Sequence, residues 1–319
     1  MTTEPLDALI IGGGPAGLAA ATGLVRQLFT AVVFDSGKYR NDVASHMHSV
    51  VGYDHVPPAT FRAKGRADIL ARYQTVRFED VAVESVRQTD DGLFEAVDAS
   101  GKEWLGRKVV LAMGVRDILP AIDGFADCWG RRIFHCLFCH GYEERGAAST
   151  GVLAVGPVMG NPMMAMHQAH SAKRLAHKVT VYTNGSEELA GQLRPEIAGE
   201  PGFSVDTRPI SGLAKGPKGS EVVVKFANGD EPQVEGFLVY NPQTEPNGPF
   251  VKQLGLELTA MGDIKSTPPF YQSSVPGVFA AGDCGTMFKV VPNAMAMGGF
   301  AAGGISFQLH GGDMSQFQH

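Results

Sequence analysis

The chain has 319 residues, enough for one large domain or two medium ones, and we expect two domains with separate hydrophobic cores. The net charge of -6 is spread along the chain, and no run of Lys or Arg occurs, which argues against nucleic acid or an anionic membrane as a partner. No apolar run reaches the roughly 20 residues of a membrane-spanning helix, and the first residues carry acids instead of a basic leader. We therefore expect a soluble, cytoplasmic protein, whose four cysteines are too few for a disulfide scaffold.

The first elements predict a dinucleotide-binding turn. Residues 6–11 form a short apolar run, GGGPAG follows at 12–17, and a helix of small residues is expected at 18–28. Gly12 allows the tight turn, Gly14 lets the backbone approach a pyrophosphate, and Gly17 lets helix and strand pack closely. A second strand, 31–34, ends at Asp35, near the spacing at which a carboxylate accepts hydrogen bonds from ribose hydroxyls. A glycine-rich turn without a ligand is the weaker alternative.

Residues 40–58 are expected to form a loop that holds three histidines, His46, His48 and His55. Imidazoles suit zinc, but this spacing matches no familiar zinc pattern, so we predict no metal. A loop that lines a substrate pocket, or solvated histidines, are the better interpretations. A second pair, His167 and His170, falls on a helix expected at 162–177, where solvated histidines are again favoured over a metal site.

The middle of the chain has the outline of a second nucleotide-binding domain. After a helix at 61–73, strand material at 75–86 and 93–98 and a buried strand at 108–113, a boundary is expected near residue 116. A strand at 151–155 then leads into GPVMG, which lacks the middle glycine of the fingerprint, and Pro157 removes a backbone donor. After the next strand, 178–182, Glu187 and Glu188 stand where a 2′-phosphate would require arginines. Further strands are expected at 203–205, 221–226, 237–241 and 277–284, and a last helix at 293–309.

The sequence HCLFCH at 135–140 carries the most specific chemistry. Two thiols separated by two residues can close a disulfide and exchange two electrons, so Cys136 and Cys139 form a candidate redox pair. A zinc site that includes Cys128, or an inert surface pair, are the alternatives. His135 and His140 are candidate proton acceptors because imidazole titrates near neutral pH. Cys128 and Cys284 are expected to be packing residues.

With IIGGGPAGLAAA and Asp35 near the start, VVLAMGVR at 109–116, the CxxC pair and PGVFAAGDC at 276–284, the chain resembles the low-molecular-weight thioredoxin reductase family of flavoproteins. The resemblance implies an α/β fold with two Rossmann-like three-layer domains. The FAD domain would be discontinuous, residues 1–116 and 243–319, and a degenerate NADPH-type domain with the redox pair would span 117–242. It also implies these FAD-binding residues: Gly12, Gly14, Pro15, Ala16, Gly17, Asp35, Ser36, Gly114, Gly282, Asp283, Asn293 and Ala294.

Two departures from that family indicate a branch. His140 replaces the aspartate that follows the second cysteine in the reductases, and the NADPH fingerprint is missing. This combination resembles the dithiol oxidases typified by gliotoxin sulfhydryl oxidase and its holomycin counterpart. The resemblance implies a homodimer that closes a disulfide in a small sulfur-containing metabolite and passes the electrons through FAD to O2, giving H2O2. Cys136 would meet the substrate and Cys139 the flavin. An NAD(P)H-dependent disulfide reductase and a non-catalytic flavin-binding protein remain alternatives.

Overall fold

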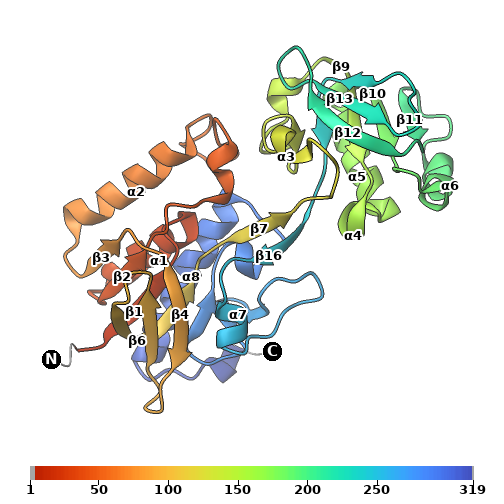
Figure 1. Cartoon of the computed structure of the whole chain (residues 1–319). Helices are drawn as coiled ribbons and strands as arrows, with labels where there is room; N and C mark the ends of the chain where they lie inside the picture. Colours follow the sequence, from red (N-terminus) through yellow and green to blue (C-terminus); the bar gives the residue numbers. More distant parts are fainter. Residues whose placement is uncertain (1–3, 318–319) are drawn as a thin grey trace. The chain divides into compact units, whose positions relative to one another are not determined.

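The computed structural model describes residues 4–317 and divides the chain into two compact units (Figure 1). Unit 1 consists of Met1–Arg116 and Thr244–His319, and unit 2 of Asp117–Gln243. The chain passes between them along β7 (Val115–Ile118) and β16 (Gln243–Pro246), which pair as a two-stranded sheet. Both units are built on parallel sheets with helices, so the predicted α/β fold with two Rossmann-like domains is confirmed. No helix among residues 4–317 is long and apolar enough to cross a membrane.

Unit 1 is organised around a sheet whose central strands are parallel, in the order β19-β6-β1-β2-β3. Alternate residues of β1 point to opposite faces of the sheet. Ala8 and Ile10 belong to the hydrophobic cluster on one face, and Leu9 and Ile11 to the cluster on the other. The strands of the sheet are β1 (Leu6–Ile11), β2 (Ala31–Phe34), β3 (Val76–Glu79), β4 (Val83–Gln88), β5 (Phe94–Asp98), β6 (Glu103–Leu111), β17 (Ser266–Thr267), β18 (Gln272–Ser273) and β19 (Val278–Ala280). The helices are α1 (Pro15–Val25), η1 (Arg40–Val43), α2 (Pro58–Arg72), α7 (Phe250–Gln253), η3 (Asp283–Gly285), α8 (Val291–Leu309) and η4 (Met314–Phe317).

Helices α1 and α8 cross closely on one face of this sheet because both are rich in small residues. A Cβ added at Gly298 would lie 2.1 Å from the carbonyl oxygen of Ala16, and one added at Gly23 would lie 2.7 Å from Ala302 Cβ. Backbones can approach this closely only where side chains are missing. The crossing therefore places the N-terminal turns of α1 and α8 near the same end of the sheet.

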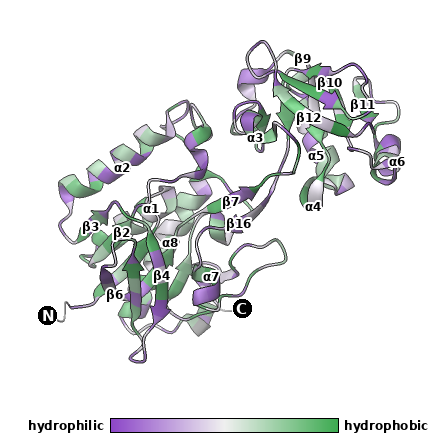
Figure 2. Cartoon of the chain, in the orientation of Figure 1, coloured by the Kyte–Doolittle hydropathy of each residue, from purple (hydrophilic) through white to green (hydrophobic). Residues whose placement is uncertain are grey.

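The other face of the sheet is covered by an antiparallel meander. Strand β5 pairs with β4 and with the first half of β6, and Phe94 and Trp104 pack under the sheet. Helix α2 lies at the outside of unit 1, carries both hydrophilic and hydrophobic residues, and buries Phe61 and Ile69 (Figure 2). This mixed pattern is typical of a helix with one face toward solvent.

Unit 2 has a parallel sheet in the order β11-β10-β9-β15-β8 and a separate antiparallel sheet β12-β13-β14. Its core gathers Phe125, Tyr182, Phe237 and their neighbours. The strands are β8 (Ile133–Phe134), β9 (Ala147–Leu153), β10 (Ala176–Tyr182), β11 (Phe203–Asp206), β12 (Ile210–Lys215), β13 (Val222–Phe226), β14 (Gln233–Glu235) and β15 (Leu238–Val239). The helices are α3 (Phe125–Cys128), η2 (Tyr142–Glu144), α4 (Gly156–Met159), α5 (Pro162–Lys173) and α6 (Glu187–Glu196).

The helix expected at 162–177 is too long. It ends at Lys173, and Ala176 already pairs with Ala147 in the parallel sheet. His177 therefore belongs to β10. The first helix also starts earlier than expected, because Pro15 fits the first helical position, where no backbone N–H is required.

Candidate functional site

The glycine turn after β1 has the backbone geometry that the sequence predicts. Gly12 has φ +121°, and a Cβ there would lie 2.2 Å from the carbonyl oxygen of Ala112. A Cβ at Gly17 would lie 1.9 Å from the carbonyl oxygen of Gly12, so glycine is required for α1 to start this close to the turn. Gly14 caps α1, Pro15 follows at the first helical position, and an added Cβ at Gly14 would meet nothing within 4 Å. The turn thus leaves open space beside the N-terminus of α1, where an anion is favoured.

Asp35 lies directly against this turn. A Cβ at Gly13 would come within 2.2 Å of Asp35 Oδ2, so Gly13, which the fingerprint does not single out, is needed for the carboxylate to take this position. Asp35 Oδ1 accepts a hydrogen bond from Gly37 N at 3.0 Å, and Oδ2 accepts one from the Tyr39 hydroxyl at 2.5 Å. Ser36, also a predicted cofactor residue, is exposed beside it.

The fold brings three predicted cofactor residues together from distant parts of the chain. A Cβ at Gly282 would lie 3.0 Å from Ala16 Cβ, at the start of α1, and 3.4 Å from Ala294 Cβ, in the first turn of α8. Gly282 has φ +81°, a conformation that favours glycine. These small residues therefore let both helix N-termini approach the end of β19.

Two further residues of unit 1 join this region without having been predicted. Arg40, in η1, forms an ion pair with the predicted residue Asp283, with Nη1 3.1 Å from Oδ2. Asn247 holds the strand end at Gly114: its backbone N–H donates to Gly114 O at 3.1 Å and its amide to Met113 O at 3.0 Å. Neither contact can be read from local sequence, because its partners are more than 130 residues apart.

Asn293 lies in the first turn of α8, but its side chain has a structural role in this structure. Its amide donates to the carbonyl oxygen of Phe288 at 2.9 Å, and its Nδ2 lies 3.5 Å from Thr286 Oγ1. The amide therefore holds the loop before α8. Its predicted contact with a cofactor stays a prediction.

The residues of unit 1 fit FAD. The open space at Gly14 suits a pyrophosphate at the N-terminus of α1, and the Asp35 carboxylate suits the ribose of the adenosine half. Arg40 adds a positive charge beside Asp283, and the N-terminus of α8 favours negative charge on the flavin ring.

In unit 2, Cys136 and Cys139 are joined by a disulfide, with their Cα atoms 5.2 Å apart. The residues between them form a tight turn: Cys139 N and His140 N both donate to the carbonyl oxygen of Cys136, at 3.1 and 3.0 Å. A Cβ at Gly141 would lie 2.1 Å from Leu137 O, so the turn requires glycine after His140. Phe138, between the cysteines, is 80% exposed. The pair thus sits in a surface turn where a thiol can be exchanged.

The two predicted proton acceptors flank this turn and are held by aromatic rings of the same unit. The His140 ring stacks on Phe134, with centroids 5.5 Å apart, and the His135 ring lies 5.8 Å from that of Trp129. Both histidines are partly buried. Aromatic contacts of this kind restrict the ring orientations, which is a requirement for directed proton transfer.

The other two thiols are buried packing residues, as predicted. Cys128 lies in the core of unit 2 and Cys284 in that of unit 1, and both are free. Burial raises the pKa of both thiols, that of Cys284 to about 12, so neither forms a thiolate readily. With Cys136 and Cys139 bonded to each other and Cys128 fully buried, the structure does not gather the ligands of the alternative zinc site.

Unit 2 contains a cavity of about 400 Å³ at the carboxyl ends of β9 and β10, the place of a nucleotide in a Rossmann domain. Its lining comprises Ala154, Val155, Gly156, Gly160, Thr183, Asn184, Ser186, Glu188, Leu189 and Gln192. This lining includes one acid, Glu188, and no basic side chain. Ser186 Oγ accepts a hydrogen bond from Leu189 N, and Asn184 Oδ1 accepts one from Ile210 N, so both oxygens already form hydrogen bonds within the protein. The cavity has the volume of a nucleoside site, and its lining offers no positive charge for a 2′-phosphate.

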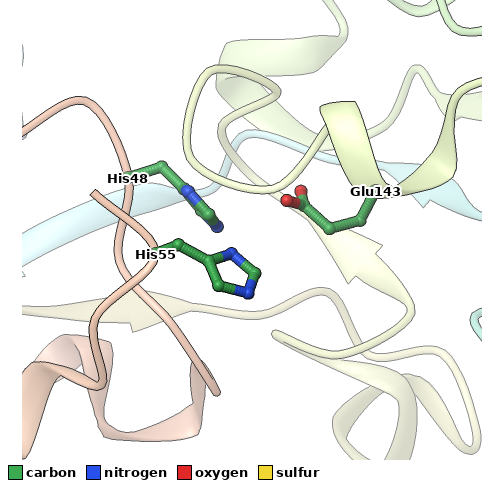
Figure 3. Close-up of side chains that lie close together, drawn as sticks. All are labelled: His48, His55 and Glu143. Atoms are coloured by element: carbon green, nitrogen blue, oxygen red, sulfur yellow. The ribbon is translucent and has the colours of Figure 1, made fainter.

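The three histidines of the predicted loop lie together in unit 1. Met47 and Val56 form an antiparallel bridge, with Met47 buried against Phe61, and the neighbouring histidines fall on the other side. His46 stacks on His55 with ring centroids 4.2 Å apart, and His48 and His55 lie beside one another at 5.2 Å (Figure 3). Two parallel stacked rings cannot both direct a nitrogen lone pair at one ion, so His46 and His55 do not form a chelate in this arrangement. His55 has φ +59°, a conformation that non-glycine residues adopt infrequently.

Comparison with known proteins decides the family. The model of the family described as pyridine nucleotide-disulphide oxidoreductase matches residues 6–298. The chain belongs to this family. Since the thioredoxin reductase-like members bind FAD, the cofactor prediction is confirmed, as is the resemblance to thioredoxin reductases.

Individual known proteins match this chain over nearly its whole length. Thioredoxin reductase aclD of Aspergillus oryzae is 49% identical, over 97% of this chain and 98% of its own length. Thioredoxin reductase sirT of Leptosphaeria maculans is 43% identical, over 99% and 98%. Among solved structures, an oxidoreductase from Agrobacterium tumefaciens has a TM-score of 0.83 at 30% identity, covering 96% of this chain and 99% of that one. The protein HlmI has a TM-score of 0.84 at 27% identity, covering 99% and 96%.

Proposed function

We propose that this protein is an FAD-dependent dithiol oxidase that closes a disulfide in a small sulfur-containing metabolite and uses O2 as the electron acceptor. The observation that carries the proposal is the cavity of unit 2, whose lining has an acid and no base where NADPH requires positive charge. The same unit carries the Cys136–Cys139 disulfide in a surface turn. A redox pair in a unit whose cavity offers no positive charge for the 2′-phosphate of NADPH favours electrons that arrive from a thiol substrate.

The proposed reaction begins with thiol–disulfide exchange. One substrate thiolate attacks a sulfur of the Cys136–Cys139 bond, forming a mixed disulfide and releasing the other cysteine as a thiolate. The second substrate thiolate then attacks the substrate sulfur of the mixed disulfide. The substrate leaves as a disulfide, and both cysteines are reduced. Two protons leave the substrate, and we assign His135 and His140 as their acceptors because both flank the turn.

Bound FAD supplies the two-electron chemistry that returns the cysteines to the disulfide, and O2 takes up the electrons to give H2O2. The overall balance is one dithiol and one O2 consumed for one disulfide and one H2O2 formed. Unit 1 holds the cofactor in this proposal, by means of the glycine turn, Asp35 and the Arg40–Asp283 ion pair. We further propose that the enzyme acts as a homodimer.

Steady-state oxygen uptake tests this function. With dithiothreitol as the dithiol probe, the holoenzyme is expected to consume O2 and release H2O2 in equal amounts. Cys139→Ser should lower this rate at least about 100-fold, because the exchange step loses one of its two sulfurs. Cys128→Ser is the matched control for cysteine replacement, since Cys128 is buried in the core and takes no part in the reaction. Uptake that survives in Cys139→Ser would contradict the proposal.

The names of the relatives support a second candidate, an NAD(P)H-dependent disulfide reductase, because aclD and sirT are both called thioredoxin reductases. The cavity of unit 2 has enough room for a nucleoside, so its charge and not its size counts against NADPH. Reduction of the disulfide reagent DTNB with NADPH as the electron donor distinguishes the two. We expect a rate at the level of a control without enzyme.

A further inference from the structure

Arg62 is a nearly buried arginine of α2 whose charge faces the loop after β2. It is 8% exposed, and its guanidinium carbon lies 3.5 Å from the centroid of the Tyr39 ring. Its Nη1 donates to Asn41 Oδ1 at 3.0 Å, and its Nη2 donates to the Asp42 carboxylate. A buried charge is tolerated only when it is paired and hydrogen-bonded, so these contacts fix the loop at residues 39–42 against α2.

Tyr39 connects this loop to the carboxylate of Asp35. Its hydroxyl donates to Asp35 Oδ2 at 2.5 Å, while Gly37 N donates to Oδ1 at 3.0 Å. Burial and the hydrogen bond to Asp35 both raise the pKa of the Tyr39 phenol, which therefore remains a donor at any physiological pH. With Gly13 also packed against Oδ2, the carboxylate is held in one orientation. Each oxygen still has a second lone pair with which to accept a further hydrogen bond.

We propose that Arg62 and Tyr39 are positioning residues for FAD: Arg62 fixes the Tyr39 ring, and the Tyr39 hydroxyl sets the Asp35 carboxylate to accept the ribose hydroxyls of the adenosine half. A carboxylate that is already oriented loses less conformational entropy when the cofactor binds. The inference concerns cofactor retention alone. It goes beyond the proposed function and holds whether a dithiol or a nicotinamide nucleotide supplies the electrons.

A double-mutant cycle on FAD binding tests the inference. FAD is removed from the full-length protein, and the dissociation constant for added FAD is measured by the change of flavin fluorescence. Tyr39→Phe and Arg62→Met should each weaken FAD binding about tenfold. Tyr39→Phe removes the charge-assisted hydrogen bond to Asp35, and Arg62→Met removes the group that holds the Tyr39 ring in place. In an Asp35→Asn background, Tyr39→Phe should weaken binding by less than about twofold, because the group through which it acts is already changed.

Arg72→Met provides the matched control. Arg72 lies in the last turn of the same helix, is largely exposed and pairs with Asp68, so FAD binding should be unchanged. The melting temperatures of the apoproteins report any loss of folding. If Arg62→Met does not fold, the double-mutant cycle with Tyr39→Phe tests the proposal instead, because this substitution removes a single hydroxyl and leaves the ring under Arg62 in place. Unchanged FAD affinity in Tyr39→Phe, or equal effects in both backgrounds, would overturn the proposal.

Discussion

Asp98 shows how one buried carboxylate fixes a turn of unit 1. It is 2% exposed and accepts hydrogen bonds from Ser100 N, Ser100 Oγ, Lys102 N and the indole N–H of Trp104. Burial alone would raise the pKa of Asp98, but these hydrogen bonds outweigh it and hold the pKa at about 2. Trp104 in turn packs beneath the sheet whose other end carries the glycine turn.

This lowered pKa predicts an acid-dependent loss of stability. The carboxyl of the unfolded chain has a pKa of about 3.9, so the stabilising effect of Asp98 is full above that pH and declines as pH falls toward about 2. Asp98→Asn should lower the free energy of unfolding at pH 7 by about 1–3 kcal/mol, because an amide replaces an acceptor of four hydrogen bonds. Urea unfolding at pH 7 and pH 3 measures both effects. If the variant and the wild type lost the same free energy of unfolding between pH 7 and pH 3, the lowered pKa of Asp98 would be contradicted.

Among the elements of unit 1, the crossing of α1 and α8 determines where three predicted cofactor residues, Ala16, Gly282 and Ala294, meet. Gly298 of α8 faces the carbonyl oxygen of Ala16, while the adjacent Gly299 would place a Cβ in open space. Ala16 of α1 and Ala294 of α8 both lie against Gly282, so a displaced α8 would move Ala294 away from the other two. The helix pair therefore links packing to cofactor binding.

Two neighbouring substitutions separate these effects. Gly298→Val should destabilise the protein by about 3 kcal/mol or more, because the side chain has no space at the crossing, and should reduce the bound FAD. Gly299→Ala should be neutral or stabilising by up to about 1 kcal/mol, since alanine is the better helix former. Thermal melting and the flavin content of the purified proteins provide the comparison. Similar effects of the two substitutions would mean that the crossing does not control the site.

The sequence predicts the central strands of unit 1 accurately for a physical reason. Parallel strands buried on both faces are continuous apolar runs, so the bounds at 6–11 and 31–34 agree with β1 and β2. Edge strands lack this signal: β12 was not predicted, because it pairs on one side only and contains an irregularity near Gly212. Helix α6, which begins at a Ser186 cap, was also missed.

The candidate site was predictable only in its local part. The glycine turn with Asp35 and the CxxC pair follow spacing rules that depend on neighbouring residues. Arg40 and Asn247 were missed because each acts on a partner brought close by the fold alone. Tyr39 was missed for a different reason: it lies four residues from Asp35, yet no motif marks a tyrosine at that position.

In the whole molecule, the two units share a parallel sheet with helices but differ in the residues at the expected nucleotide position. Unit 1 retains the turn, the ribose carboxylate and the close helix approach that a dinucleotide requires. Unit 2 has the parallel sheet and a cavity at the expected edge, and the lining of that cavity includes Glu188 and no basic side chain. A shared architecture therefore does not by itself give the two units the same ligand.

In the proposed reaction, electrons enter the enzyme from a dithiol and not from NADPH. An anaerobic titration of the purified holoenzyme, first with NADPH and then with dithiothreitol, tests it most directly through the absorbance of the flavin. We expect no bleaching by NADPH, bleaching by the dithiol, and release of H2O2 when air is admitted. Rapid bleaching by stoichiometric NADPH would contradict it, because the cavity of unit 2 would then bind the nucleotide without basic side chains in its lining.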